Sequence, residues 1–126
     1  MDALYDRVGG EPFFVDLVNH FYLGVAGDPL LRPLYPDDLE ESSRHLALFL
    51  MQYWGGPGTY GEERGHPRLR MRHAPFVIGP AEREAWLRHM LAALTELESR
   101  ARITAADALE LRDYLEMAAN SLVNAP

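Results

Sequence analysis

The sequence of 126 residues contains no cysteine. Disulfides, iron–sulfur clusters, thiolate-ligated metals and cysteine-based zinc sites are therefore excluded. Lysine is also absent, so all twelve basic residues are arginine, and 19 acidic residues outnumber them to give a formal net charge of −7. An acidic chain is poorly suited to nucleic acid or to an anionic membrane, and neither is expected as a partner.

Long apolar runs are missing as well. No stretch approaches the ~18 residues of a membrane span, and the first residues lack the basic and apolar regions of a signal peptide. We therefore expect a protein of the cytoplasm. No stretch of useful length alternates apolar and polar residues with a period of two, so no β-strand is predicted. Glycine-rich nucleotide motifs and a Gly-x-Ser-x-Gly nucleophile motif are absent too.

The length of the chain suits one domain over residues 1–126. Its apolar residues recur mainly at helical spacing. A first main helix is predicted to start at Gly10–Pro12 and to reach Val25. Asp28–Pro29 should open a short helical piece that Pro33 and Pro36 limit. Asp37 and Asp38 precede the next helix, whose buried stripe is predicted to include Leu39, Leu46, Phe49, Leu50, Tyr53 and Trp54.

The second half follows the same pattern after an interruption. From Gly55 to Pro67 glycine and proline are frequent and no period is visible, which predicts a long irregular loop. Gly79–Pro80 and Thr104–Asp107 then have the residue types that start helices. The predicted class is all-α, with four main helices and several short ones.

The segment from His66 to Phe76 carries the most specific chemical pattern. It contains three arginines and ends in His73-Ala74-Pro75, where the backbone must stop or turn. A histidine at such a break can present a ring nitrogen to a metal, and neighbouring arginines suit an anionic cofactor. We therefore hypothesise that His73 holds a haem iron. By spacing alone, a histidine such as His73 is more often a surface or turn residue than a ligand.

The other histidines form no recognisable metal site. His-x-x-x-His spacing on a helix is absent, and the single Glu-x-x-His match, ending at His66, lies in the predicted loop. His20, His45 and His89 are expected at solvated helix positions. Tyr22, Tyr35 and Trp86 combine an apolar body with one polar group, so by themselves they fit the core.

Taken together, several short motifs in order along the chain resemble the group II truncated haemoglobins, a bacterial globin family. They are Tyr5–Gly10, Phe21–Tyr22, Leu34–Pro36, Gln52–Pro57, Gly65–Phe76, Ala85–Leu87 and Tyr114–Ala119. The resemblance implies a shortened globin, with two helices packed over two around haem b. It further implies that His73 is the proximal iron ligand and that the opposite side is open to oxygen and other diatomic gases.

The resemblance also implies roles for the residues around the haem. Distal positions that face the gas correspond to Tyr22, Tyr35, Trp86 and Ser42. Haem contacts correspond to Tyr35, His45, Leu46, Phe49, Tyr60, Arg72 and Trp86, of which Arg72, Tyr60 and His45 match positions beside the propionates. O–H and N–H donors aimed at bound oxygen, which carries partial negative charge, would slow its release.

Three functions follow from these interpretations. The first is reversible oxygen binding with tight distal hydrogen bonding, which favours sensing, storage or redox chemistry over bulk oxygen transport. The second is a haem-dependent nitric oxide dioxygenase or peroxidase, which would need an external reductase because the chain has no reductase domain. The third is a cofactor-free helical interaction module. A monomer or a homodimer is compatible with each.

Overall fold

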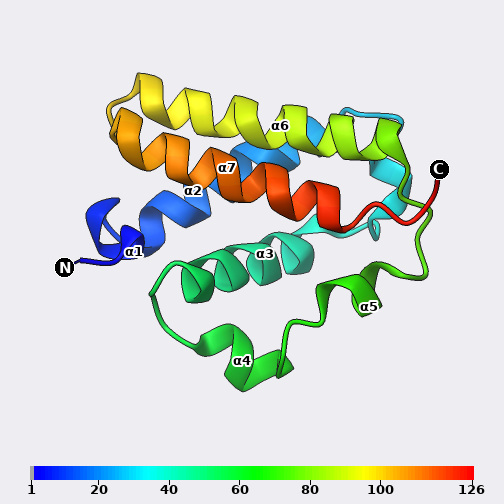
Figure 1. The fold of residues 1–126 in the computed structure, drawn as a ribbon, viewed down its shortest axis with the longest axis horizontal. Coiled ribbons are helices and arrows are strands. Elements are labelled where there is room, and N and C mark those ends of the chain that lie inside the picture. Colours follow the sequence, from blue (N-terminus) through cyan, green and yellow to red (C-terminus); the bar gives the residue numbers. More distant parts are fainter. Residues whose placement is uncertain (1) are drawn as a thin grey trace.

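The computed structural model describes residues 2–126, and this part of the chain is helical without a strand. Its elements are α1 (Leu4–Arg7), α2 (Glu11–Ala26), the 3₁₀ turn η1 (Arg32–Leu34), α3 (Leu39–Tyr53), α4 (Thr59–Arg64), α5 (Leu69–His73), α6 (Pro80–Ser99) and α7 (Ala105–Ser121). Helices α6 and α7 lie side by side, and α2 packs against both α6 and α3 (Figure 1). The all-α class is confirmed.

Helix starts coincide with the predicted capping residues. The Asp38 carboxylate accepts a hydrogen bond from the Glu40 amide at the start of α3, and the Thr104 hydroxyl accepts one from the Asp107 amide at the start of α7. At α6, the Glu82 side chain accepts the Gly79 amide at 2.7 Å, with Pro80 in the first turn. These side chains satisfy amides that have no partner inside the helix.

The core is centred on α2, which is apolar on most of its surface. Phe13, Phe14 and Phe21 are completely buried, and Leu94 of α6 and Leu111 of α7 are fully buried in the same core cluster. Such a helix is stable only when neighbours cover several of its sides, and α3 and α6 do so here. No helix in residues 2–126 is both long and apolar enough to span a bilayer.

Three local predictions are wrong. The stretch predicted to be irregular contains α4, because the Gln52 side chain accepts the Gly61 amide at 2.8 Å and Arg44 forms two 2.7 Å hydrogen bonds with Glu63. The short helical piece starts at Arg32 rather than at Asp28–Pro29. Tyr53 is 51% exposed, since it lies at the last turn of α3 beyond the core.

Helices α2 and α6 approach closely where Gly24 faces His89. The His89 ring is fixed by a 2.7 Å contact between its Nε2 and the Asp28 carboxylate, which also accepts the Leu30 amide. This hydrogen bond with His89, followed by that from Leu30, holds the pKa of Asp28 below its ordinary value. His89 was expected to be solvated, but it ties the turn after α2 to α6.

Replacing Gly24 by alanine tests this close approach, because the new Cβ would clash with His89 Nδ1. We expect Gly24→Ala to lower the free energy of unfolding by about 1–3 kcal/mol. In a His89→Ala background the same change should be neutral or should stabilise by up to about 1 kcal/mol, since alanine favours helix over glycine. Urea unfolding of the four proteins measures the difference, and equal costs in both backgrounds would contradict the packing described.

Candidate functional site

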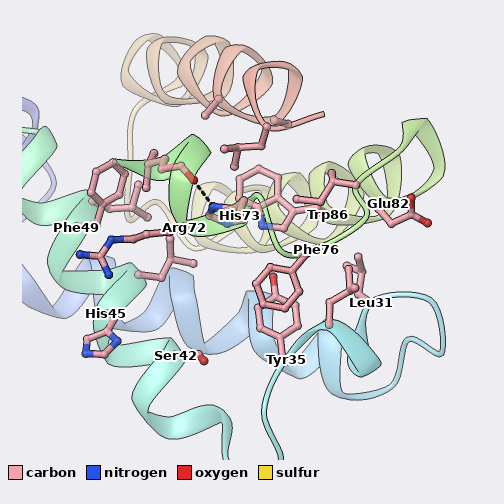
Figure 2. A pocket seen from close by; sticks show the side chains of 18 of the residues that line it. Leu31, Tyr35, Ser42, His45, Phe49, Arg72, His73, Phe76, Glu82 and Trp86 are labelled. Carbon is pink, nitrogen blue, oxygen red and sulfur yellow. Dashed lines mark hydrogen bonds between the residues drawn. The ribbon is translucent and has the colours of Figure 1, made fainter. Parts of the chain in front are cut away.

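A largely apolar cavity of about 360 Å³ lies between α3, α5, α6 and α7, with the end of α2 and the turn at η1 completing its wall. The structure brings all ten predicted site residues to this cavity: Tyr22, Tyr35, Ser42, His45, Leu46, Phe49, Tyr60, Arg72, His73 and Trp86. They come from distant parts of the chain and converge around one space (Figure 2). Its volume and its apolar wall with few polar groups are typical of a cofactor site.

His73 is the last residue of α5 and is oriented by its own helix. Its Nδ1 lies 2.7 Å from the Leu69 carbonyl oxygen (Figure 2). A carbonyl can only accept, so Nδ1 carries the proton and donates it. In the neutral form of the ring this contact leaves the lone pair on Nε2, which is the form that a metal requires.

The segment around His73 is held by polar contacts rather than by the core, since no residue of α5 is buried. Arg72 donates to the carbonyl oxygens of Pro67 at 2.8 Å and Arg64 at 3.0 Å. On the other side, the Asn124 side chain donates from Nδ2 to the Phe76 carbonyl at 2.9 Å. Its Oδ1 accepts a hydrogen bond from the Ile78 backbone amide at 2.8 Å. These bonds fix where His73 enters the cavity.

No group of three or more histidine, aspartate and glutamate side chains lies close enough to hold a bare metal ion within residues 2–126. His73 therefore suits a metal that brings most of its own ligands. A haem iron is such a metal, because the porphyrin supplies four nitrogens and the protein adds an axial ligand.

Tyr22, Tyr35 and Trp86 form an aromatic group elsewhere in the wall. The rings of Tyr22 and Tyr35 meet edge to face at a centroid distance of 5.5 Å, and Phe21 contacts both Tyr22 and Trp86. Burial raises the pKa of Tyr35 to about 12, while the Trp86 N–H partly opposes that shift. Burial, followed by the proximity of Tyr35, raises the pKa of Tyr22 even further. Both phenols therefore remain O–H donors at neutral pH.

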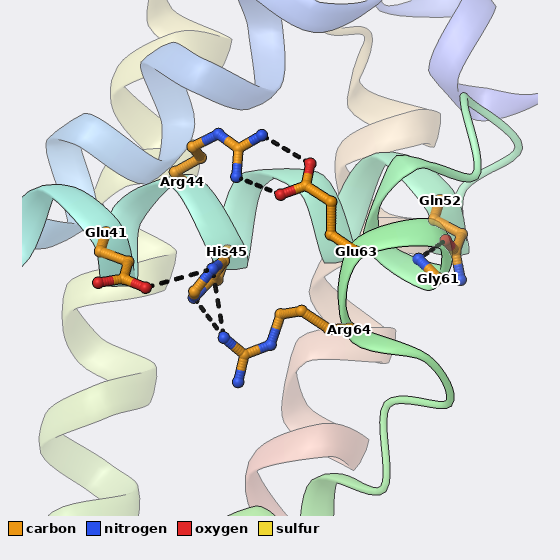
Figure 3. A network of polar contacts seen from close by, with 7 residues as sticks. All are labelled: Glu41, Arg44, His45, Gln52, Gly61, Glu63 and Arg64. Carbon is orange, nitrogen blue, oxygen red and sulfur yellow. Dashed lines mark hydrogen bonds and ion pairs between the residues drawn. The ribbon is translucent and has the colours of Figure 1, made fainter.

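A polar network joins α3 to α4 at the edge of the cavity (Figure 3). Arg64 Nη1 lies 2.8 Å from His45 Nδ1, and Glu41 lies 3.8 Å from His45 Nε2. Since arginine can only donate, the bonded His45 nitrogen must accept. Partial burial, followed by the charge of Arg64, lowers the pKa of His45. His45 is thus neutral at neutral pH.

Arg64 is a cavity residue that the sequence prediction missed. Its guanidinium lies 5.9 Å from the centre of the Tyr60 ring, and its Nε is buried without a hydrogen-bond partner among the described residues. Leaving such a donor unsatisfied costs free energy. A carboxylate in the cavity would satisfy it, so the site fits an anionic cofactor. The run of arginines could have pointed to Arg64 as a residue of the site. It was missed because Arg64 lay in the stretch predicted to be irregular.

The pairing of Arg64 with His45 can be tested in the haem-free protein. Arg64→Ala should raise the pKa of His45, because it removes a positive charge and a donor that favour the neutral ring. Arg44→Ala should raise it less, since Arg44 is engaged by Glu63. NMR titration of the His45 ring measures both values. An unchanged pKa in Arg64→Ala, or a larger shift in Arg44→Ala, would refute the network.

Comparisons with known proteins agree with this geometry. The model of the bacterial-like globin family matches residues 3–121. The group 2 truncated hemoglobin YjbI of Bacillus subtilis is 40% identical over 127 residues, covering 98% of this chain and 89% of that protein. A thermostable hemoglobin from Thermobifida fusca has a TM-score of 0.94 at 52% identity, with 99% of each chain covered. The hemoglobin of Chloroflexus aurantiacus has a TM-score of 0.93 at 52% sequence identity, with 98% of this chain and 99% of that chain covered.

The resemblance inferred from the short sequence motifs is therefore confirmed. The family model spans most of the chain, and the solved relatives share its helical arrangement throughout. The chain belongs to the bacterial-like globins and, among them, to the group II truncated haemoglobins.

Proposed function

We propose that this protein binds haem b through His73 Nε2 and binds oxygen reversibly on the opposite side of the haem. The observation that carries the proposal is the 2.7 Å hydrogen bond from His73 Nδ1 to the Leu69 carbonyl. It fixes the tautomer and the ring direction that a ligand to iron needs. Membership of a haem-binding family supports the same cofactor.

When bound, haem supplies an iron with a free position for a diatomic gas. The cavity wall supplies apolar contacts from Leu46 and Phe49 on α3. Arg64 Nε, buried and unpartnered, provides a donor for one haem carboxylate. Arg72, Tyr60 and His45 lie along the same wall, although Arg72 already donates to two backbone carbonyls.

The phenol and indole donors of Tyr22, Tyr35 and Trp86 are proposed to stabilise the bound oxygen. A hydrogen bond to a charged partner contributes about 1.5–3 kcal/mol. At about 1.4 kcal/mol per tenfold, one such bond slows release roughly ten- to a hundredfold. Tight retention favours sensing, storage or redox chemistry over bulk transport. The solved Bacillus subtilis relative, 41% identical, is described as oxygen-avid, which supports this reading.

Replacing His73 by glycine tests the proximal ligand. Because loss of a residue that merely supports a metal ligand already costs about 10–100-fold in affinity, His73→Gly should weaken haem binding by more than this. Added imidazole should restore the ferrous spectrum by occupying the space left by the ring. His66→Gly, at an exposed histidine outside the cavity, is the matched control. Unchanged haem affinity and spectra in His73→Gly would contradict the proposal.

Removing the indole N–H tests the distal donors. Trp86→Phe keeps an aromatic ring against Phe21 but loses the donor, so oxygen dissociation should become about tenfold faster or more. Ser42→Ala should change it less, since the serine is small and lies on α3, on the opposite side of the view from Trp86 (Figure 2). Stopped-flow release rates measure both variants. A larger effect of Ser42→Ala would show that the donors are wrongly identified.

A further inference from the structure

Charge is divided unevenly along this acidic chain. Residues 64–81 contain four arginines and two histidines but no aspartate or glutamate. The remaining residues contain eight arginines and 19 acidic residues and therefore carry a formal net charge of 8 − 19 = −11, against +4 for this segment. None of these four arginines forms an ion pair within the described part of the chain. In the haem-loaded protein Arg64 would face a haem carboxylate, whereas the exposed Arg68 and Arg70 keep their positive charge towards solvent.

A hollow of about 530 Å³ lies on the outer side of this segment. Arg70, Phe76 and Val77 line it, together with residues 120–125 beyond and at the end of α7. Arg70 is exposed, and the two apolar side chains are 41% and 72% exposed, respectively. We refer to this surface as the outer hollow. It combines a positive charge with apolar side chains in water, a combination found at sites of protein contact.

The wall between the outer hollow and the cavity is thin. Phe76 and Leu122 line both spaces. Asn124, which also lines the outer hollow, donates to the Phe76 carbonyl at 2.9 Å and to the His73 carbonyl at 3.4 Å. A molecule seated in the outer hollow would therefore be one layer of side chains away from the cavity and from the backbone of His73.

We propose that the outer hollow is the docking surface for an acidic one-electron carrier protein that reduces ferric iron held in the cavity. This rests on the proposed function, because a haem iron must be ferrous to bind oxygen reversibly. The reduced centre of the carrier loses one electron and is oxidised, and the ferric iron gains that electron and becomes ferrous. No bond forms or breaks, and no proton is transferred.

The charge distribution indicates the kind of partner. Residues 64–81 carry +4 and the rest of the chain carries −11, so an acidic protein should be attracted to this segment, and the charges should orient the encounter as well as accelerate it. Electron-transfer contacts are small and short-lived, and a single hollow with two exposed apolar side chains suits them. The contact should weaken as salt screens the charges.

Reduction of the haem-loaded ferric protein by reduced plant-type ferredoxin, an acidic iron–sulfur carrier, tests the proposal by stopped flow. At low salt, Arg70→Glu and Val77→Asp should each slow the second-order rate about tenfold. Arg112→Glu on α7 makes the same charge change as Arg70→Glu outside both spaces, and should alter the rate less than about twofold. Dithionite should reduce all four proteins equally.

A second readout does not depend on reduction. In NMR titrations with oxidised ferredoxin, residues of the outer hollow should shift, and the affinity should fall about as much in Arg70→Glu as the rate does. Equal rates for Arg70→Glu and Arg112→Glu, or shifts elsewhere on the molecule, would overturn the proposal. So would Arg70-dependent binding to phosphatidylserine vesicles without any response to ferredoxin. Failure to bind haem would instead refute the proposed function.

Discussion

One hydrogen bond determines what the cavity can hold. The Leu69 carbonyl accepts a hydrogen bond from His73 Nδ1, so in the neutral ring the lone pair lies on Nε2. With the ring reversed, Nε2 would bear the proton and present no lone pair. The proposed attachment of haem therefore depends on this single nitrogen. The aromatic donors matter only if iron is held there.

The two sides of the cavity are built in different ways. Tyr22 and Trp86 belong to α2 and α6, which pack against each other in the core. Their positions are therefore fixed by close packing. His73 belongs to a helix of five residues with no buried side chain, held by polar contacts from Arg72 and Asn124. The proposed donors are thus held rigidly, whereas the proposed ligand His73 is held by polar contacts in the segment that also separates the cavity from the outer hollow.

How far the sequence predicts this structure depends on the range of the interaction. Capping at Thr104 was predicted correctly, and the cap of α3 falls on Asp38 within the predicted pair Asp37–Asp38, because the residues involved lie within three positions of each other. Helix α4 was missed because Gln52 and Arg44 on another helix stabilise it, and glycine-rich composition gives no sign of them. His89 was misjudged for the same reason, since its partner Asp28 is 61 residues away.

The candidate site shows the same division. The ten predicted residues all line one cavity. They could be predicted because a family resemblance carries three-dimensional information that residue spacing alone lacks. Arg64 was missed because its role depends on an unsatisfied Nε, and only coordinates reveal such an atom. Likewise, the basic run was visible in the sequence, but its position beside a thin wall was not.

Ligation of the iron by a histidine, which we propose to be His73, can be observed in the spectrum of the ferrous, gas-free protein. Resonance Raman spectroscopy detects the stretching of the bond between iron and an imidazole nitrogen. In protein whose histidines carry nitrogen-15, we predict that this band moves to lower frequency. A band that ignores the label, or a spectrum without any such band, would contradict the assignment of a neutral imidazole to the iron.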